Sequence, residues 1–230
     1  MGSLKKIYIL HGWTYATEKW QPFLDVLKDN GFEVVFLKIP GLTEKLDKVW
    51  NIETYVEWLN DKLGNEKSVT IAGHSNGGRI ALAFSLKYPE KVKQLILIDS
   101  AGIYHRDALI TLKRVVFKLV AKMGKKITSS ATLRNLLYRV VRENDYKNAP
   151  PIVKETMANL IAVDLSPFLV KITTPTLIIW GSDDKITPLK DGKLMHTLIK
   201  NSKLEIIDGA RHSPQFTHPE IVIKKIVENI

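Results

Sequence analysis

The chain has 230 residues, 45% of them hydrophobic, which is typical of one large globular domain and excludes a disordered chain. It contains no cysteine, which excludes disulfides, thiolate metal sites and a cysteine nucleophile, so serine must perform any nucleophilic step. The net charge of +10 is concentrated between residues 103 and 166, which hold twelve Lys or Arg against five Asp or Glu. No nucleic-acid-binding motif accompanies this basic segment, so we expect no nucleic-acid partner.

The first elements along the chain are two short apolar runs, at residues 7–10 and 34–37, separated by a helical pattern. Thr17 is predicted to cap a helix over residues 18–30, and Gly31 to end it. A second helix is predicted over residues 52–63, before Gly64. The run at residues 7–10 is too short for a secretion signal or a membrane span, so we expect a cytoplasmic protein.

The most informative stretch follows, where an apolar run at residues 69–72 leads into Gly73-His74-Ser75-Asn76-Gly77 and then into a helix predicted over residues 76–88. The pattern G-x-S-x-G between a strand and a helix is typical of a strained turn that exposes the serine. Flanking glycines permit the close backbone approach that such a turn requires. Taken alone, a serine at this position is more often a helix N-cap than a nucleophile.

After a fourth apolar run at residues 95–98, the alternation of strands and helices stops. Residues 103–166 carry three amphipathic helical patterns, at about 107–123, 131–142 and 151–163, and we expect them to form an all-helical lid. Residues 1–102 and 167–230 then form the core. The lid's cations either serve only solubility or bind an acidic partner.

Two further apolar runs, at residues 176–180 and 204–207, are each followed by side chains suited to catalysis. Asp183 and Asp184 follow the first run, and His212 follows the second. A serine hydroxyl needs a general base, usually a histidine oriented by an acid. The order Ser, Asp, His along the chain is the one used by α/β-hydrolases. Helices are predicted over residues 188–199 and 219–229.

Together these elements predict an α/β fold with a doubly wound, mainly parallel sheet. Continuous apolar runs indicate strands buried on both faces, and helices between them indicate right-handed crossovers. The carboxyl ends of parallel strands meet at one edge of the sheet. We therefore expect Ser75, the acid and His212 at that edge.

The chain resembles the α/β-hydrolase superfamily over nearly its whole length. The motifs that carry the resemblance are His11-Gly12, Gly73-His74-Ser75-Asn76-Gly77-Gly78, Tyr88-Pro89-Glu90-Lys91-Val92, Pro175-Thr176-Leu177, Gly181-x-x-Asp184-x-x-x-Pro188 and His212. The chain starts at what resembles the third strand of the eight-stranded family sheet, so the resemblance implies a smaller sheet. Residues His11-Gly12-Trp13 followed by Trp20, with a short helical lid, are similar to small carboxylesterases such as pimeloyl-acyl-carrier-protein methyl ester esterases.

The resemblance implies a role for each matching position. Ser75 would be the nucleophile, His212 the base and Asp184 the orienting acid, because the family places this acid three residues after Gly181. The backbone N–H groups of Trp13 and Asn76 occupy the positions that form the family's oxyanion hole. No cofactor and no metal site is expected.

These roles predict a serine hydrolase of carboxylic esters with short to medium acyl chains, acting on a small-molecule ester through an acyl-enzyme. A thioesterase or a carbon–carbon bond hydrolase on the same scaffold is the alternative, and a non-catalytic ligand-binding receptor is a third. The basic lid, with Lys113, Arg114 and Lys118, suits an acidic carrier protein that presents a tethered acyl ester.

Overall fold

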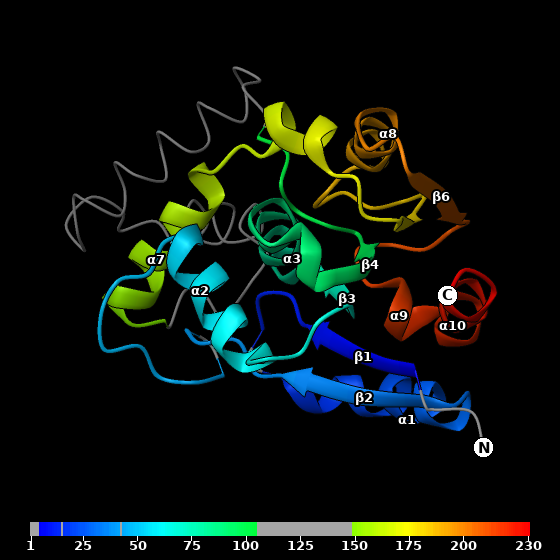
Figure 1. The fold of residues 1–230 in the computed structure, drawn as a ribbon, viewed down its shortest axis with the longest axis horizontal. Coiled ribbons are helices and arrows are strands. Elements are labelled where there is room, and N and C mark those ends of the chain that lie inside the picture. The colour runs from blue at the N-terminus through cyan, green and yellow to red at the C-terminus, as the bar shows by residue number, and fades with distance from the viewer. Residues whose placement is uncertain (1–4, 15, 42, 105–148) are drawn as a thin grey trace, which may run out of the picture.

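The computed structural model describes residues 5–14, 16–41, 43–104 and 149–230, which form a parallel sheet with helices on both faces (Figure 1). The strands are β1 (Lys5–Leu10), β2 (Phe32–Leu37), β3 (Val69–His74), β4 (Val92–Ile98), β5 (Thr176–Gly181) and β6 (Ser202–Ile207). Each of the six predicted strands is confirmed. Among the described residues, no helix has the length and apolar character needed to cross a membrane.

The six strands are hydrogen-bonded in the order β2-β1-β3-β4-β5-β6, and every neighbouring pair is parallel. This arrangement confirms the predicted α/β fold with a parallel sheet. The chain leaves β1, β3, β4, β5 and β6 at the same sheet edge, so the residues that follow these strands are brought together there.

The helices are α1 (Gln21–Asp29), α2 (Ile52–Leu63), α3 (Asn76–Lys87), α7 (Pro151–Ala162), α8 (Leu189–Leu198), α9 (Pro214–Thr217) and α10 (Pro219–Glu228). Asn51 caps α2 by accepting from the Thr54 N–H at 2.9 Å, and Gly64 ends it with a φ of 56°. The predicted cap at Thr17 is wrong. Thr17 instead starts a 3-10 turn, Thr17–Trp20, and α1 begins only at Gln21 with Pro22 in its first turn.

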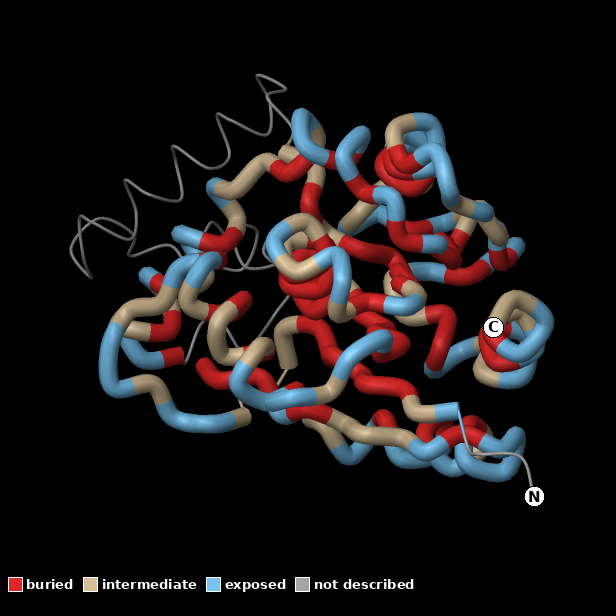
Figure 2. The backbone as a smooth tube through the Cα atoms, viewed as in Figure 1, coloured by how far each residue is buried: buried red, intermediate tan, exposed pale blue. Residues whose placement is uncertain are grey.

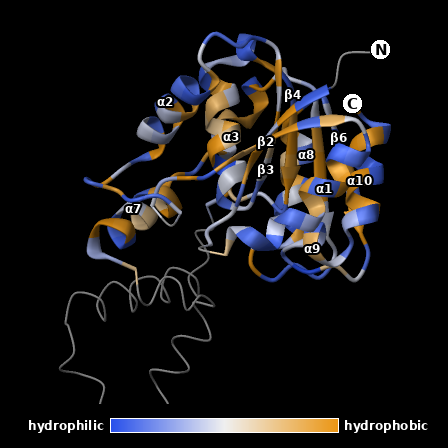
Figure 3. Cartoon of the chain, turned by 90° about the horizontal axis from the view of Figure 1, so that it is seen from below, coloured by the Kyte–Doolittle hydropathy of each residue, from blue (hydrophilic) through white to orange (hydrophobic). Residues whose placement is uncertain are grey.

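Alternate residues of the strands face two separate apolar layers. Tyr8, Ile71 and Leu97 pack with α2, α3 and α8, whereas Ile9, Ala72 and Ile98 pack with α1 and α10. The inner strands β3 and β5 are buried along their whole length, as their continuous apolar sequences predict. The edge strands β2 and β6 are partly exposed, because each has a neighbour on one side only. Figures 2 and 3 show the buried, apolar sheet between helices whose outer faces are polar.

The predicted lid is described only in part. Helix α7 confirms the third helical pattern. The backbone N–H of Trp50 donates to the buried Thr156 hydroxyl at 3.0 Å, and this bond attaches α7 to the loop before α2. The patterns at 107–123 and 131–142 lie outside the described residues, and so do Lys113, Arg114 and Lys118. The division of the chain into core and lid stays a prediction.

Candidate active site

The turn between β3 and α3 holds Ser75 in a strained conformation. Its φ of 53° and ψ of −117° lie outside the regions that non-glycine residues favour, at a typical cost of about 1–3 kcal/mol. Hydrogen bonds on both sides fix the turn: Ser75 N–H donates to Ile98 O at 3.1 Å, and Ser75 O accepts from Ala101 N–H at 2.9 Å. Its hydroxyl makes no capping bond to α3 and is left for other partners.

Three glycines make this turn possible by removing side chains from crowded points. A Cβ atom at Gly73 would lie 2.6 Å from the Gly77 carbonyl oxygen. One at Gly77 would collide with the carbonyls of Leu10 and His11, and one at Gly78 would collide with Ser100. The glycines of the sequence motif are therefore required mainly for close packing of β1, β3 and α3.

A hydrogen-bonded chain of three side chains ends at Ser75. His212 Nε2 lies 3.0 Å from Ser75 Oγ, and His212 Nδ1 lies 2.8 Å from Asp184 Oδ2. Because the Asp184 carboxylate only accepts, Nδ1 carries the proton, and the unprotonated Nε2 accepts from the Ser75 hydroxyl. The structure thus brings together three of the predicted site residues, from the ends of β3, β5 and β6.

Asp184 is held as a carboxylate in a buried position. Its side chain is fully buried, and Oδ1 accepts from the N–H groups of Ile186 and Thr187 at 2.7 and 3.1 Å. Burial alone would raise the pKa of Asp184, but hydrogen bonds from His212 and Thr187 and the charge of His212 outweigh it and hold that pKa below its usual range. Asp183 is exposed beside Ser182, so Asp184 is the neighbour of His212.

The loop after β1 lies against the serine turn. A Cβ atom at Gly12 would lie 3.1 Å from Ser75 Cβ, which places the chain entering Trp13 beside the serine. The buried His11 fixes this loop: its Nδ1–H donates to Gly12 O at 2.6 Å, and its Nε2 accepts from Ile39 N–H at 3.0 Å. Asn76 is the first residue of α3, so its N–H has no acceptor within the helix.

The Trp13 side chain points to a different neighbour. It packs against Ala149 and Val153, at the start of α7, together with Leu46. The loop that carries the Trp13 N–H is therefore in contact with the described part of the predicted lid.

His74, inside the serine motif, joins the serine turn to the histidine loop. Its Nε2–H donates to the backbone oxygen of His212 at 2.8 Å. Burial, followed by the charge of His212, lowers the pKa of His74 to about 3, so the ring stays neutral. Within the described part of the chain, its buried Nδ1 has no hydrogen-bond partner. His74 therefore serves as structural support at the end of β3.

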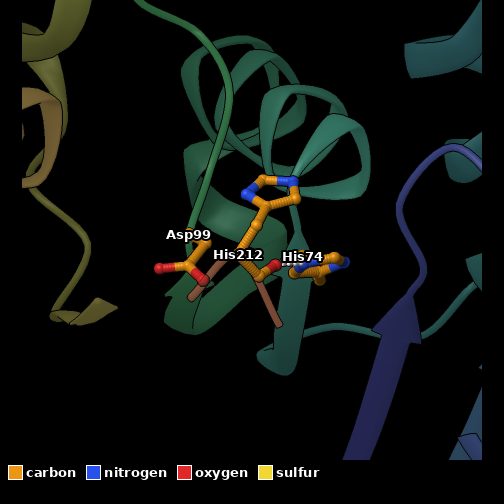
Figure 4. Close-up of side chains that lie close together, drawn as sticks. All are labelled: His74, Asp99 and His212. Carbon is orange, nitrogen blue, oxygen red and sulfur yellow. Dashed lines mark hydrogen bonds between the residues drawn. The ribbon is translucent and has the colours of Figure 1, made fainter. Parts of the chain in front are cut away.

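Sequence reasoning missed a fourth side chain at this edge, Asp99. It directly follows the buried strand β4 and is fully buried. The signal was present, because a carboxylate directly after a strand of the parallel sheet must lie at the same edge as the residues after β3, β5 and β6. Figure 4 shows His212 between Asp99 and His74.

His74, Asp99 and His212 each offer a possible ligand atom, and these atoms lie within 4.8 Å of one another. An ion at this point would have to take a His212 nitrogen from Ser75 or Asp184, which engage both of them. The arrangement therefore favours proton transfer along the three-residue chain.

Comparison with known proteins gives a family and two kinds of relative. A family model described as alpha/beta hydrolase fold matches residues 5–219. The chain is 27% identical to a pimeloyl-[acyl-carrier protein] methyl ester esterase of Legionella pneumophila (strain Paris), over 97% of this chain and 94% of that protein. It is 29% identical to a 2-hydroxy-6-oxononadienedioate/2-hydroxy-6-oxononatrienedioate hydrolase of Cupriavidus pinatubonensis, over 96% of this chain and 85% of that protein.

Among solved structures, a thermophilic esterase from Thermogutta terrifontis has a similar fold. The TM-score is 0.74 at 23% identity, and the match covers 99% of this chain and 90% of that chain. At this identity the likeness supports the fold alone.

Proposed function

The chain belongs to the α/β-hydrolase family, and from this premise we propose that it is a serine hydrolase of carboxylic esters that uses Ser75, His212 and Asp184. The observation that carries the proposal is the hydrogen-bonded chain from Asp184 through His212 to Ser75 Oγ, with bonds of 2.8 and 3.0 Å. A serine hydroxyl in this arrangement meets the geometric requirement for an activated nucleophile.

In the first half of the reaction, Ser75 Oγ attacks the ester carbonyl while His212 Nε2 takes the hydroxyl proton. The backbone N–H groups of Trp13 and Asn76 hold the negative oxygen that forms. Each such donor typically stabilises the transition state by about 3–4 kcal/mol. Asp184 stabilises the imidazolium. His212 then gives its proton to the departing alkoxide, which is released as the alcohol. The acyl group remains bound to Ser75 Oγ as an ester.

In the second half, His212 takes a proton from water as the water oxygen attacks the acyl carbon. The tetrahedral intermediate collapses, the Ser75 oxygen recovers the proton from His212, and the carboxylic acid is released. A short to medium acyl chain is proposed because a lid over residues 103–166 would bound the pocket.

The test of this proposal is covalent labelling combined with turnover. The purified chain should hydrolyse p-nitrophenyl butyrate and gain the mass of one fluorophosphonate adduct on Ser75, and Ser75→Ala should lose both properties. Ser202→Ala is the matched control, because Ser202 begins β6 at the opposite edge of the sheet. Wild-type turnover in the Ser75 variant would disprove the assignment.

A carbon–carbon bond hydrolase is the second candidate, supported by the 29% identity to a relative named as a hydrolase of a 2-hydroxy-6-oxo dienedioate. The same serine, histidine and acid can serve several leaving groups, so the fold does not separate them. Esters, acyl thioesters and vinylogous diketones should be compared at matched concentration, and the highest kcat/KM that Ser75→Ala abolishes identifies the reaction.

An acidic carrier protein is the proposed partner, supported by the basic segment 103–166 and by the relative named for an acyl-carrier-protein substrate. Binding to acyl carrier protein should weaken steeply between low and physiological salt. Reversal of Lys113, Arg114 and Lys118 to Glu should abolish it. The control reverses Lys62, Lys67 and Lys93, which are exposed at the opposite sheet edge and change the net charge equally. Equal loss in both triple variants would contradict the proposal.

A further inference from the structure

Arg79 is a buried cation in the first turn of α3 that the proposed reaction does not use. It follows Asn76 by three residues, so the two side chains project from the same face of the helix. Each residue is only 7% exposed, and Arg79 Nη1 donates to Asn76 Oδ1 at 3.2 Å. A hydrogen bond from a charged donor is stronger than one between neutral groups, and burial strengthens it further. This bond therefore fixes the direction in which the Asn76 amide oxygen points.

The side chain of Asn76 carries an acceptor beside the N–H group that is proposed to bind the oxyanion. Asn76 begins α3, so the N–H groups of the first three residues have no acceptor within the helix. The first helical bond runs from Arg79 N–H to Ser75 O at 3.2 Å. Asparagine oxygens accept readily from their own N–H or from the N–H two residues later. Without a partner of its own, Asn76 Oδ1 would compete with the substrate for these donors.

The backbone of this turn cannot relieve that competition by moving. A Cβ atom at Gly77 would collide with the Leu10 carbonyl, so the first turn of α3 is in close contact with the end of β1. Close-packed backbone of this kind has one position, whereas the Asn76 side chain can rotate about two bonds. Access to the Asn76 N–H therefore depends on where its own amide oxygen is held.

We propose that Arg79 is a positioning residue for the oxyanion hole, which binds Asn76 Oδ1 and so keeps the Asn76 N–H open to the substrate. The proposal rests on the proposed function, because it assumes that this N–H stabilises the oxyanion. Arg79 acts through Asn76 and needs no contact with the substrate. A competing bond at the hole weakens the transition state more than the bound ester, so loss of Arg79 lowers kcat and leaves KM nearly unchanged.

The first experiment replaces Arg79 by Met, which keeps an apolar stem and removes every donor. The kcat for p-nitrophenyl butyrate should fall about tenfold, less than the hundredfold or more that follows complete loss of an oxyanion donor, and KM should change by less than about twofold. Arg79→Lys keeps a charged donor and should recover most of kcat. Lys87→Met removes an exposed cation at the other end of α3 and is the matched control, with wild-type kcat expected.

The second experiment removes the competing acceptor. Leucine at position 76 cannot accept from an N–H group, so in an Asn76→Leu background Arg79→Met should change kcat by less than about twofold. Inhibition by a trifluoromethyl ketone reports on the hole itself, because its tetrahedral adduct with Ser75 places a negative oxygen there. Its Ki should rise about tenfold in Arg79→Met and should be unaffected by Arg79→Met in the Asn76→Leu background.

Three results would overturn the proposal: wild-type kcat in Arg79→Met, an equal loss of kcat from Arg79→Met in both backgrounds, or an unchanged Ki for the ketone. Thermal unfolding checks that each variant is folded, and Arg79→Leu replaces Arg79→Met if the latter does not fold. Failure of the proposed function is distinct, because Ser75→Ala would then keep its activity and the ketone would form no adduct with the wild-type chain.

Discussion

Two regions of the active edge are built by different means. The serine turn, residues 73–78, is shaped by backbone packed on backbone: Gly73 and Gly77 leave no room for a Cβ atom. The acid–base loops, residues 181–187 and 209–213, are crowded in the same way at Gly181, but their catalytic side chains are held by hydrogen bonds: Asp184 accepts from the Ile186 N–H and from His212 Nδ1–H. A side chain that clashes with backbone atoms has no alternative position, whereas a lost hydrogen bond can be replaced by a bond from another group.

This difference predicts how each region responds to substitution. At Gly73 and Gly77 of the serine turn, adding one methyl group should be destructive, because the opposing atoms are backbone of α3, of β1 and of the loop after β1. In the acid–base loops, loss of a single hydrogen-bonding group should change stability or activity by a smaller amount that depends on pH. The predictions below test that contrast.

The largest expected effect is that of Gly77→Ala. The new methyl group would collide with the carbonyls of Leu10 and His11, so the free energy of unfolding should fall by about 3 kcal/mol or more, measured by denaturant unfolding. Gly31→Ala is the matched control: its φ of 82° is strained for alanine, but no atom lies within 4 Å. It should cost only about 1–2 kcal/mol. Equal losses of stability in the two variants would show that backbone crowding at Gly77 does not shape the serine turn.

The next effect, smaller for each pH unit, is that of pH on the stability of Asp99→Asn. Burial and the negative charge of Asp184 raise the pKa of Asp99 from 3.8 to about 8, so the folded state binds more protons than the unfolded state between these values. Wild-type stability should therefore fall as pH rises through this window, by up to about 1.4 kcal/mol per pH unit from this group. Asparagine keeps an acceptor for the Gly181 N–H, which donates to Asp99 Oδ1, and removes the slope.

Chemical denaturation of both proteins at pH 4 to 9 measures the difference, which should grow in favour of Asp99→Asn and level off above pH 8. Asp61→Asn, at an exposed site in α2, is the control and should track the wild type. A difference that does not change with pH would show that Asp99 is not held neutral.

The contrast between the two regions also explains how much could be predicted from the sequence. All six strands were predictable: the four inner ones because inner strands of a parallel sheet are mainly apolar, and β2 and β6 because they still carry short apolar runs between predicted helices. The serine turn was predictable because its crowded positions require glycine, and these glycines form a recognisable sequence motif. Thr17 failed as a cap because a 3-10 turn at its position delays the start of α1, and the sequence does not distinguish the two turns.

The acid–base loops leave a weaker record in the sequence. Choosing Asp184 over Asp183 needed the family pattern, since both carboxylates follow the same strand and only the fold buries one of them. Asp99 was missed because its importance depends on distance to His212 and on burial, neither of which is a pattern along the chain. Residues 105–148 carry much of the prediction about substrate, and they lie outside the described residues.

A smaller effect is expected at His74, which connects the two regions. His74→Phe keeps a ring but removes the donor to His212 O, so kcat should fall by about tenfold with KM little changed. His74→Gln, whose amide N–H can reach the same acceptor, should recover most of kcat. Equal loss of kcat in both variants would mean that ring packing, and not the bond to His212, is what matters.

His74 also affects stability in acid. Because its pKa is lowered from 6.5 to about 3, the folded state binds fewer protons than the unfolded state in this range, and wild-type stability should fall as pH decreases below 6.5. Both variants remove this titration, so their stability should change less between pH 6.5 and 4, as denaturant unfolding would measure.

The smallest effect concerns the loop after β1, which belongs to neither region. Trp13, whose N–H is proposed to bind the oxyanion, packs on Val153 of α7. Val153→Ala loosens that contact, so kcat should fall about threefold to fivefold if α7 holds the loop in place. Ile161→Ala, half-buried at the other end of α7, is the control and should leave kcat unchanged. Equal kcat values in the two variants would contradict this prediction. The packing of Trp13 on α7 would then have no effect on the chemical step, and the lid could act only on substrate binding.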